Sequence, residues 1–289
     1  IIDSGTVTVG GNLAATTDAN NGVINLGTLA VDGTVALATN GTGAATVVND
    51  AGLIIAASTV GGNLAATATT GNITDNGVLT VAGTSSFTTS ANNADITLNN
   101  TNALTGTVAL NTSGSGNALI DNGITALNLA TSTVGGNLTL TSGHASGIID
   151  SSTVTVGGNL VATTDAANGV ITMDGLRVDG TVQLTTHGSG DATVVNDAGL
   201  TFLASTVRNL AATATTGNIV DSGVLTVAGT SSFTTSANNA DITLDLANVL
   251  TGTVALNTTG GSGNALIDNG TTALNLATST VGGNLTLTS

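Results

Sequence analysis

The sequence predicts an all-β protein, a right-handed parallel β-helix (β-solenoid) in which short strands stack coil upon coil. Three observations predict this fold: a Gly-Gly motif recurs along the chain, long blocks of sequence are repeated, and helix-forming residues are scarce. The chain has 289 residues, with 40 glycines and no proline or cysteine. It lacks Glu and Lys, which favour helices. We expect about 24 residues and three short strands per coil, and about twelve coils.

The recurrent motif is Thr-Val-Gly-Gly-Asn-Leu, as at residues 133–138. A β-branched pair precedes two glycines, and the chain then resumes with Asn and an apolar residue. This order is typical of a strand, a tight corner and a second strand. The motif also stands at residues 8–13, 59–64, 155–160 and 280–285, and in shortened form at residues 206–210.

Long blocks of the sequence return after about half the length of the chain. Residues 77–98 are repeated without change as 223–244, and residues 125–142 as 272–289. We therefore expect two solenoid repeats of six coils each, 1–147 and 148–289, in one continuous solenoid. One residue is lost where Gly61-Gly62 becomes Arg208, at a predicted corner, where deletions are tolerated.

The spacing of the corner glycines predicts the length of a coil. Most intervals between them are close to the expected coil length, and two are clearly longer. Such lengths suit one coil of a β-solenoid, and no stretch shows the i, i+3, i+4 apolar pattern of a helix. The glycines that define the intervals are Gly11, Gly33, Gly62, Gly83, Gly106, Gly136 and Gly158.

Each coil is expected to contain three strands. The first follows the corner glycine, as at residues 107–111, and a loop rich in Asn, Gly, Ser and Thr comes next. The second precedes an Asx-Gly turn, as at residues 45–49, and the third, as at 53–57, leads to the next corner. Alternation such as Leu13 and Ala15 places apolar side chains inward.

Antiparallel hairpins are the alternative to a parallel solenoid. Asn-Gly pairs such as Asn76-Gly77 and Asn122-Gly123 fit two-residue hairpin turns. Hairpins, however, give no reason for a regular interval between glycine corners, whereas stacked coils require one. Parallel connections within a sheet are right-handed by strong preference, and the absence of proline suits unbroken ladders.

The charge of the chain excludes one class of partner. Seventeen acidic residues, all Asp, face two cations, Arg177 and Arg208, which gives a net charge of −15. Nucleic-acid binding depends on phosphate neutralisation by Lys and Arg, so no nucleic-acid partner is expected. No apolar run approaches the roughly 20 residues of a membrane helix, so no membrane span is expected.

Aspartate recurs before a small residue and glycine. In one interpretation each Asp caps a corner by accepting a hydrogen bond from its own backbone two residues on. In the other the carboxylates form a line of Ca²⁺ sites. The glycine-aspartate nonapeptide of Ca²⁺-binding solenoids is missing, so capping is favoured. These residues are Asp3, Asp50, Asp75, Asp121, Asp150, Asp197, Asp221 and Asp268.

Asparagine recurs directly after the corner glycines, and Thr34, Thr84 and Thr107 take this place in other coils. We expect a stacked Asn/Thr ladder that satisfies corner carbonyls, in preference to a ligand-binding row. Because Asn recurs only in some coils, a continuous Asn ladder is not expected. The asparagines assigned to this one corner position are Asn12, Asn63, Asn137, Asn159, Asn209 and Asn284.

The two histidines are the remaining candidates for chemistry. His144 and His187 stand in loops, and neither recurs in the other repeat. An enzyme site needs a cluster of reactive side chains that breaks the repeat, and the repeat is unbroken. We therefore predict no enzyme, with no catalytic, cofactor-binding or metal-binding residues and no cofactor.

The Thr-Val-Gly-Gly-Asn-Leu motif, the Asx-Gly turns and the near-identical blocks resemble the shafts of filamentous-haemagglutinin-like adhesins and related giant bacterial β-strand-repeat surface proteins. The resemblance covers the whole chain, but its motifs are structural. It implies a right-handed parallel β-helix, export to the cell surface, and a role in adhesion or in extracellular fibres. It implies no functional residues.

The expected function is a structural, non-enzymatic shaft segment of an extracellular fibre or surface adhesin, held by axial hydrogen-bond ladders. The alternative is a solenoid binding module that recognises glycan or ice through loops or a flat Thr-rich face, to which Thr6, Thr8, Thr139 and Thr141 point. Further copies of the repeat, joined covalently or end to end, are the expected partners, because neither end shows a polar capping coil. Host-cell or matrix glycans are the second expected partner class.

Overall fold

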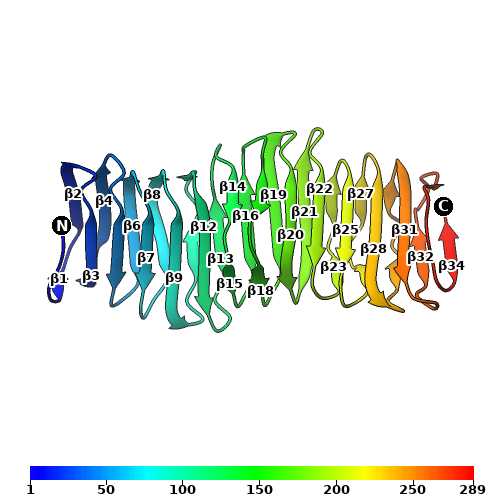
Figure 1. Ribbon diagram of the computed structural model, residues 1–289, viewed down its shortest axis with the longest axis horizontal. Helices are drawn as coiled ribbons and strands as arrows, with labels where there is room; N and C mark the ends of the chain where they lie inside the picture. Colours follow the sequence, from blue (N-terminus) through cyan, green and yellow to red (C-terminus); the bar gives the residue numbers. More distant parts are fainter. The chain divides into compact units, whose positions relative to one another are not determined.

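The computed structural model describes all 289 residues and confirms an all-β parallel β-solenoid, with about 13 coils. The chain divides into two compact units, Ile1–His144 (unit 1) and Ala145–Ser289 (unit 2). In Figure 1 unit 1 runs from blue to green and unit 2 from green to red. No helix long and apolar enough to cross a membrane occurs in either unit.

Unit 1 consists of two parallel sheets, between which the chain alternates. Sheet A of unit 1 stacks, in order, β1 (Val7–Val9), β3 (Ile24–Val31), β5 (Ala45–Asn49), β7 (Leu64–Ala68), β9 (Ser85–Asn92), β12 (Thr107–Ser113) and β14 (Leu127–Leu129), and β15 (Ser132–Val134) also pairs with β12. Sheet B stacks β2 (Leu13–Asn20), β4 (Thr34–Asn40), β6 (Leu53–Val60), β8 (Ile73–Val81), β10 (Ile96–Leu98), β13 (Ala118–Asp121) and β16 (Leu138–Ser142), and β11 (Ala103–Leu104) also pairs with β8.

Unit 2 is built in the same way. Its sheet A contains β17 (Ile148–Asp150), β18 (Val154–Val156), β20 (Ile171–Val178), β22 (Ala192–Asn196), β25 (Leu210–Ala214), β28 (Ser231–Asn238), β31 (Thr253–Thr259) and β33 (Asn275–Leu276). Its sheet B contains β19 (Leu160–Ala167), β21 (Thr181–His187), β23 (Leu200–Phe202), β24 (Ser205–Val207), β26 (Ile219–Asp221), β27 (Leu225–Val227), β29 (Ile242–Leu244), β30 (Val249–Leu250), β32 (Ala265–Asp268) and β34 (Leu285–Thr288).

The predicted three strands per coil are found where the strand of sheet B is broken in two, and also where the strand of sheet A is broken, as between β14 and β15. Strands β10, β11 and β12 follow one another in such a coil. Elsewhere the two sheet-B strands are joined in one bent strand, as in β6, whose register shifts between Ala56 and Ser58. All strand pairs are parallel, which excludes the hairpin alternative.

The coils are shorter than the sequence predicted, and their length varies. The smallest offset between ladder partners joins Ala192 to Leu210, and the pairing of Ser231 with Val254 is among the largest. The mean repeat is about 21 residues, which gives about 13 coils in place of the predicted twelve.

The error arose because the Gly-Gly motif is used at two different corners. Gly33 leads into β4 of sheet B, whereas Gly62 leads into β7 of sheet A, and Gly136 leads into β16 of sheet B again. The two long intervals between corner glycines are therefore one coil plus the passage to the other sheet. The six motif asparagines accordingly do not share one position, because Asn63 and Asn209 precede strands of sheet A.

The corners need glycine because consecutive coils touch there through their backbones. The N–H of Gly83 donates a hydrogen bond of 3.0 Å to the carbonyl of Gly62. A Cβ atom on Gly83 would lie 2.6 Å from the carbonyl carbon and oxygen of Gly62. That distance is too short for any side chain, so glycine recurs at this position.

The core between the sheets is mainly aliphatic. In β5 the side chains of Ala45, Val47 and Asn49 are buried, and the residues between them face outward. The three phenylalanines are fully buried. Phe87 stacks between Ala66 and Leu110 of the neighbouring coils, so that a small residue offsets its volume.

Candidate functional site

The recurrent aspartates fall into different structural groups. Asp121 and Asp268 accept hydrogen bonds of 2.8 Å from the backbone N–H groups of Gly123 and Gly270, two residues on. This is the predicted capping geometry, and it is confirmed for these two residues. The carboxylates are therefore occupied by their own turns.

Four other aspartates bond to the following coil instead. Asp3 accepts backbone hydrogen bonds from Gly27 (3.1 Å) and Thr28 (2.7 Å), and Asp75 accepts them from Asn99 (3.0 Å) and Asn100 (3.2 Å). The prediction of capping within their own turns is wrong for this group, because the next coil bends there and presents N–H groups that no strand pairs. Asp150 and Asp221 repeat the arrangement in unit 2.

These carboxyl groups differ in their affinity for a proton. The backbone hydrogen bond from Thr28 is the main reason that the pKa of Asp3 lies below its ordinary value. Burial raises the pKa of Asp150 and of Asp221, although hydrogen bonds oppose the shift. The negative charge of Asp174, where unit 1 has Gly27, adds to the rise at Asp150.

Four asparagines of the motif, Asn12, Asn63, Asn159 and Asn209, accept hydrogen bonds from backbone N–H groups, whereas bonds to carbonyls were predicted. Asn12 Oδ1 accepts a hydrogen bond of 2.9 Å from the N–H of Thr34, and Asn63 Oδ1 accepts one of 2.9 Å from Thr84. The predicted contact between coils through Asn and Thr is therefore present, but the side chain is the acceptor.

A continuous polar ladder, which we did not predict, runs along the edge of sheet B. Asn72, Asp95 and Asn117 each accept a hydrogen bond from the N–H group one coil on, at 2.9, 2.7 and 2.8 Å, the last donated by Asn137. Asn218, Asp241, Asn264 and Asn284 repeat this ladder in unit 2. Its sequence signal is a polar residue before the first buried residue of each strand.

Six buried asparagines were also not predicted from the sequence. Asn49 Oδ1 accepts a hydrogen bond of 2.9 Å from the N–H of Val31, and its Nδ2 donates one of 3.0 Å to the carbonyl of Val31. The side-chain amide thus takes the place of a backbone peptide where the ladder would otherwise be interrupted. The six residues are Asn49, Asn102, Asn122, Asn196, Asn248 and Asn269.

The serine before Thr-Val acts similarly. Ser58 Oγ accepts a hydrogen bond of 3.0 Å from the N–H of Leu37 and donates one of 2.8 Å to the carbonyl of Ala56. Ser132, Ser205 and Ser279 make the equivalent bonds in their coils. The Ser-Thr-Val segment therefore serves to join coils.

Arg208 occupies the shortened motif without breaking the corner. Its N–H donates to the carbonyl of Gly190 (3.1 Å), and its Nη1 lies 3.8 Å from Asp191 Oδ1. Asn209 keeps the usual bond of 2.7 Å from the N–H of Thr230. The corner thus accommodates the loss of one residue, as the sequence indicated.

His144 follows β16 in a loop, as predicted, whereas His187 is the last residue of β21 and not a loop residue. Nδ1 of the exposed His187 lies 2.7 Å from the carbonyl oxygen of Thr164 in the preceding coil. The N–H of His144 donates to Ser142 Oγ (3.3 Å). No group of three or more His, Cys, Asp or Glu side chains is placed to hold a metal ion.

The remaining candidate is a surface groove that occurs once in each unit. Groove 1, of about 280 Å³, is lined by Thr6, Gly27, Thr28, Leu29, Val48, Asp50 and Thr69. Groove 2, of about 190 Å³, is lined by the residues at the corresponding places, Thr153, Asp174, Gly175, Leu176, Val195, Asp197 and Thr215. Because the groove occurs at the same place in both units, it is a product of the fold. It lies where β5 in unit 1 and β22 in unit 2 end.

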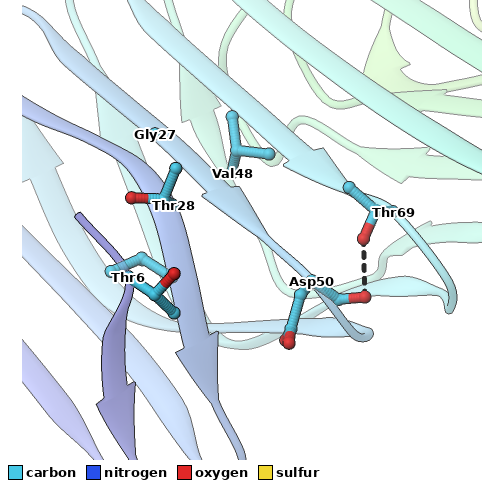
Figure 2. A pocket seen from close by; sticks show the side chains of 7 residues that line it. Thr6, Gly27, Thr28, Val48, Asp50 and Thr69 are labelled. Carbon is cyan, nitrogen blue, oxygen red and sulfur yellow. Dashed lines mark hydrogen bonds between the residues drawn. The ribbon is translucent and has the colours of Figure 1, made fainter.

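Figure 2 shows groove 1, with Thr6 and Thr28 on one side and Asp50 and Thr69 on the other. The hydroxyl of Thr69 donates a hydrogen bond of 2.5 Å to the backbone carbonyl of Asp50. The Asp50 side chain extends away from this bond and is exposed. In groove 2 the equivalent carboxylate, Asp197, is paired with Arg177.

Two segments of the chain match a family model described as repeats of unknown function (DUF5649), residues 42–111 and 189–257. The two segments lie at the same place in the two units, from before β5 into β12 and from before β22 into β31. No curated protein and no solved structure matches the chain. The match supports a repeat-containing β-helix protein.

Proposed function

We propose that the chain is a structural, non-enzymatic shaft segment of a long extracellular fibre or surface adhesin, in keeping with its resemblance to filamentous-haemagglutinin-like shafts. One observation supports the proposal: polar side chains at several different positions of the coil all form hydrogen bonds with a neighbouring coil. Asn49, Asn72 and Ser58 illustrate three such positions. The repeat solenoid architecture is consistent with a mechanical role.

The mechanism follows from the direction of these bonds. The backbone ladders join each coil to its neighbours, and the buried amides and hydroxyls add bonds where the ladder is interrupted. A coil cannot leave the stack without breaking all of them together, which opposes both stretching and proteolysis. Only Arg177 and Arg208 offer cleavage sites to trypsin.

Further copies of the repeat are the partners that we propose, joined covalently or end to end. Residues 272–289 repeat residues 125–142. Leu276, Leu285 and Leu287 are 38–43% exposed, whereas their counterparts Leu129, Leu138 and Leu140 are fully buried. The same leucine side chains are therefore buried in one copy of this sequence block. In the proposed fibre a further copy of the repeat packs on those of unit 2.

The location is tested by immunogold electron microscopy on intact source cells, with antibodies against the folded chain. We expect label along filaments outside the cell. Label that appears only after the cells are permeabilised would contradict an extracellular fibre. The sizes of the labelled species in reducing and denaturing gels then separate one giant chain from a polymer.

A binding module for ice is the second candidate, favoured by a column of outward threonines in sheet B of unit 2. Thr163, Thr185, Thr206 and Thr226 stand in direct register on consecutive coils. Regularly spaced threonines can order water. Thermal hysteresis of the folded chain tests this, with Thr206→Lys expected to abolish it and Thr251→Lys, outside the column, as the control.

Glycan recognition is the other form of this second candidate, with host-cell or matrix glycans as partners. The loops that would carry it stack in pairs: Asn21, with a φ of 60°, accepts a hydrogen bond of 2.8 Å from the N–H of Thr42. Binding on a glycan array, lost when the loops are shortened, is the expected result. An intact solenoid that binds no glycan would contradict it.

A further inference from the structure

Grooves 1 and 2 have the same backbone frame. Leu29 pairs with Asn49 in unit 1, and Leu176 pairs with Asn196 in unit 2. The next residues along these strands therefore face each other across the ladder: Ala30 faces Asp50, and Arg177 faces Asp197. The N–H groups of both aspartates donate hydrogen bonds of 2.9 Å to the leucine carbonyls, so the aspartates are held alike.

The grooves differ in what meets the aspartate carboxylate. Arg177 Nε lies 3.1 Å from Asp197 Oδ2, an ion pair that places a guanidinium beside groove 2. At groove 1 the corresponding residue is Ala30, which has no polar group to offer. The Asp50 carboxylate has neither a hydrogen bond nor an ion pair within the chain. Groove 1 is also the larger of the two.

From this comparison we infer that Asp50 of groove 1 binds an arginine side chain of a partner protein, as Asp197 of groove 2 binds Arg177 of the same chain. Unit 2 thus shows the carboxylate with a guanidinium partner, and unit 1 shows the carboxylate without one.

The chemistry of groove 1 suits such a ligand. The carboxylate of Asp50 offers the acceptor that a planar guanidinium prefers. Val48 and the threonine methyl groups offer apolar contact for the aliphatic part of an arginine side chain. The net charge of −15 attracts a basic segment at long range. The proposed partner is therefore a protein segment with an exposed arginine.

The test is an NMR titration of the full chain with Nα-acetyl-arginine amide at constant ionic strength. Because a single exposed ion pair contributes at most about 1 kcal/mol, we expect a weak dissociation constant, of about tens to hundreds of millimolar, which chemical shifts detect. The backbone amide signals of Asp50 and Thr69 should shift and saturate together. Nα-acetyl-citrulline amide, of similar shape but uncharged, should leave them unchanged.

Three variants make the test specific. Asp50→Asn should abolish the saturable shift. Ala30→Arg copies unit 2 into unit 1 and should also abolish it, because the guanidinium of the same chain then pairs with the Asp50 carboxylate. Arg177→Ala should free the Asp197 carboxylate, which lines groove 2 together with Asp174, and a second set of shifts should appear at Asp197 and Thr215.

Three results would overturn the inference. A shift of the same signals by the citrulline probe would show that the charge of the ligand is irrelevant. Ala30→Arg with a well-dispersed spectrum and undiminished binding would place the ligand elsewhere. A response of Asp50 to CaCl₂ but not to the arginine probe would make groove 1 a cation site.

Discussion

At the scale of single residues, the structure depends on positions where one atom decides whether two coils fit together. Gly83 and Asn49 represent the two kinds. Gly83 leaves room for the backbone of the preceding coil, and Asn49 supplies the hydrogen bonds that the backbone of its own coil does not. Each kind predicts a measurable loss of stability.

Gly83→Ala should destabilise the protein by about 1–3 kcal/mol, because the new Cβ atom would lie 2.6 Å from backbone atoms of Gly62 that cannot move aside. Urea unfolding followed by circular dichroism measures this. Gly27→Ala is the matched control, because no atom lies within 4 Å of a Cβ placed there. Equal losses in the two variants would show that steric crowding is not the reason for glycine at the corner.

Asn49→Ala should lower the free energy of unfolding by about 3 kcal/mol, because it leaves the buried N–H and C=O of Val31 without partners. Asn76→Ala, at an exposed position, should change it little. Unfolding by urea again gives the comparison. A small effect at Asn49 would mean that water enters and replaces the amide.

The sequence predicts these two residues unequally well. Glycine recurs at the corners of the repeat, and this recurrence predicts that the position has no room for a side chain. Asn49 resembles any surface Asn before an Asx-Gly turn, and only its parity with Ala45 and Val47 in the same strand places it inward. The hydrogen bonds that Asp3 accepts from Gly27 and Thr28 join residues of different coils, so no local pattern predicts them.

At the scale of the strand, ionisable groups lie where one strand ends and the next coil bends. Asp150 ends β17, and Asp221 ends β26. A carboxyl whose pKa is higher in the folded than in the unfolded state binds its proton preferentially to the folded state. Its contribution to stability is unfavourable at neutral pH and is relieved as the pH falls through the folded pKa.

We therefore expect the free energy of unfolding to rise as the pH falls from 7 towards about 4. Asp3 has a lowered pKa, so its favourable contribution is lost only below its ordinary value of 3.8. Urea unfolding at several pH values measures the trend. In the double variant Asp150→Asn, Asp221→Asn the rise should be smaller than in the parent, and an unchanged rise would assign it to general charge repulsion.

Strand stacking was predictable and coil length was not. The alternation of buried and exposed residues, the absence of proline and the repeats indicate a parallel solenoid, because each strand is too short to be stable alone. The coil length was overestimated because Gly33 and Gly62 look alike in sequence while leading into different sheets. Only the ladder partners of β4 and β7 distinguish the two corners.

At the scale of the whole molecule, stability should depend on the number of coils. Each strand pairs with the coils before and after it, so the removal of a complete coil leaves the remaining ladders able to rejoin. Ser85 pairs with Val108, and a deletion of residues 85–107 therefore brings Val108 to the place of Ser85 opposite Leu64.

This deletion of one complete coil should leave a folded solenoid with an unchanged strand signal per residue in circular dichroism and a smaller urea m-value, because less surface is exposed on unfolding. Deletion of β9 alone (Ser85–Asn92) is the control, since it leaves a coil shorter than the shortest one observed, between Ala192 and Leu210. If both deletions fold equally well, the coil is not the unit of stability.

The use of one Gly-Gly motif at both corners has a consequence for the gene. Unequal recombination between two copies of the motif that lead into the same sheet removes or adds complete coils, so the ladders on both sides are able to rejoin. An exchange that aligns the same residue of both copies keeps the reading frame. We therefore expect related genes to differ more in the number of coils that they encode than in the length of a single coil.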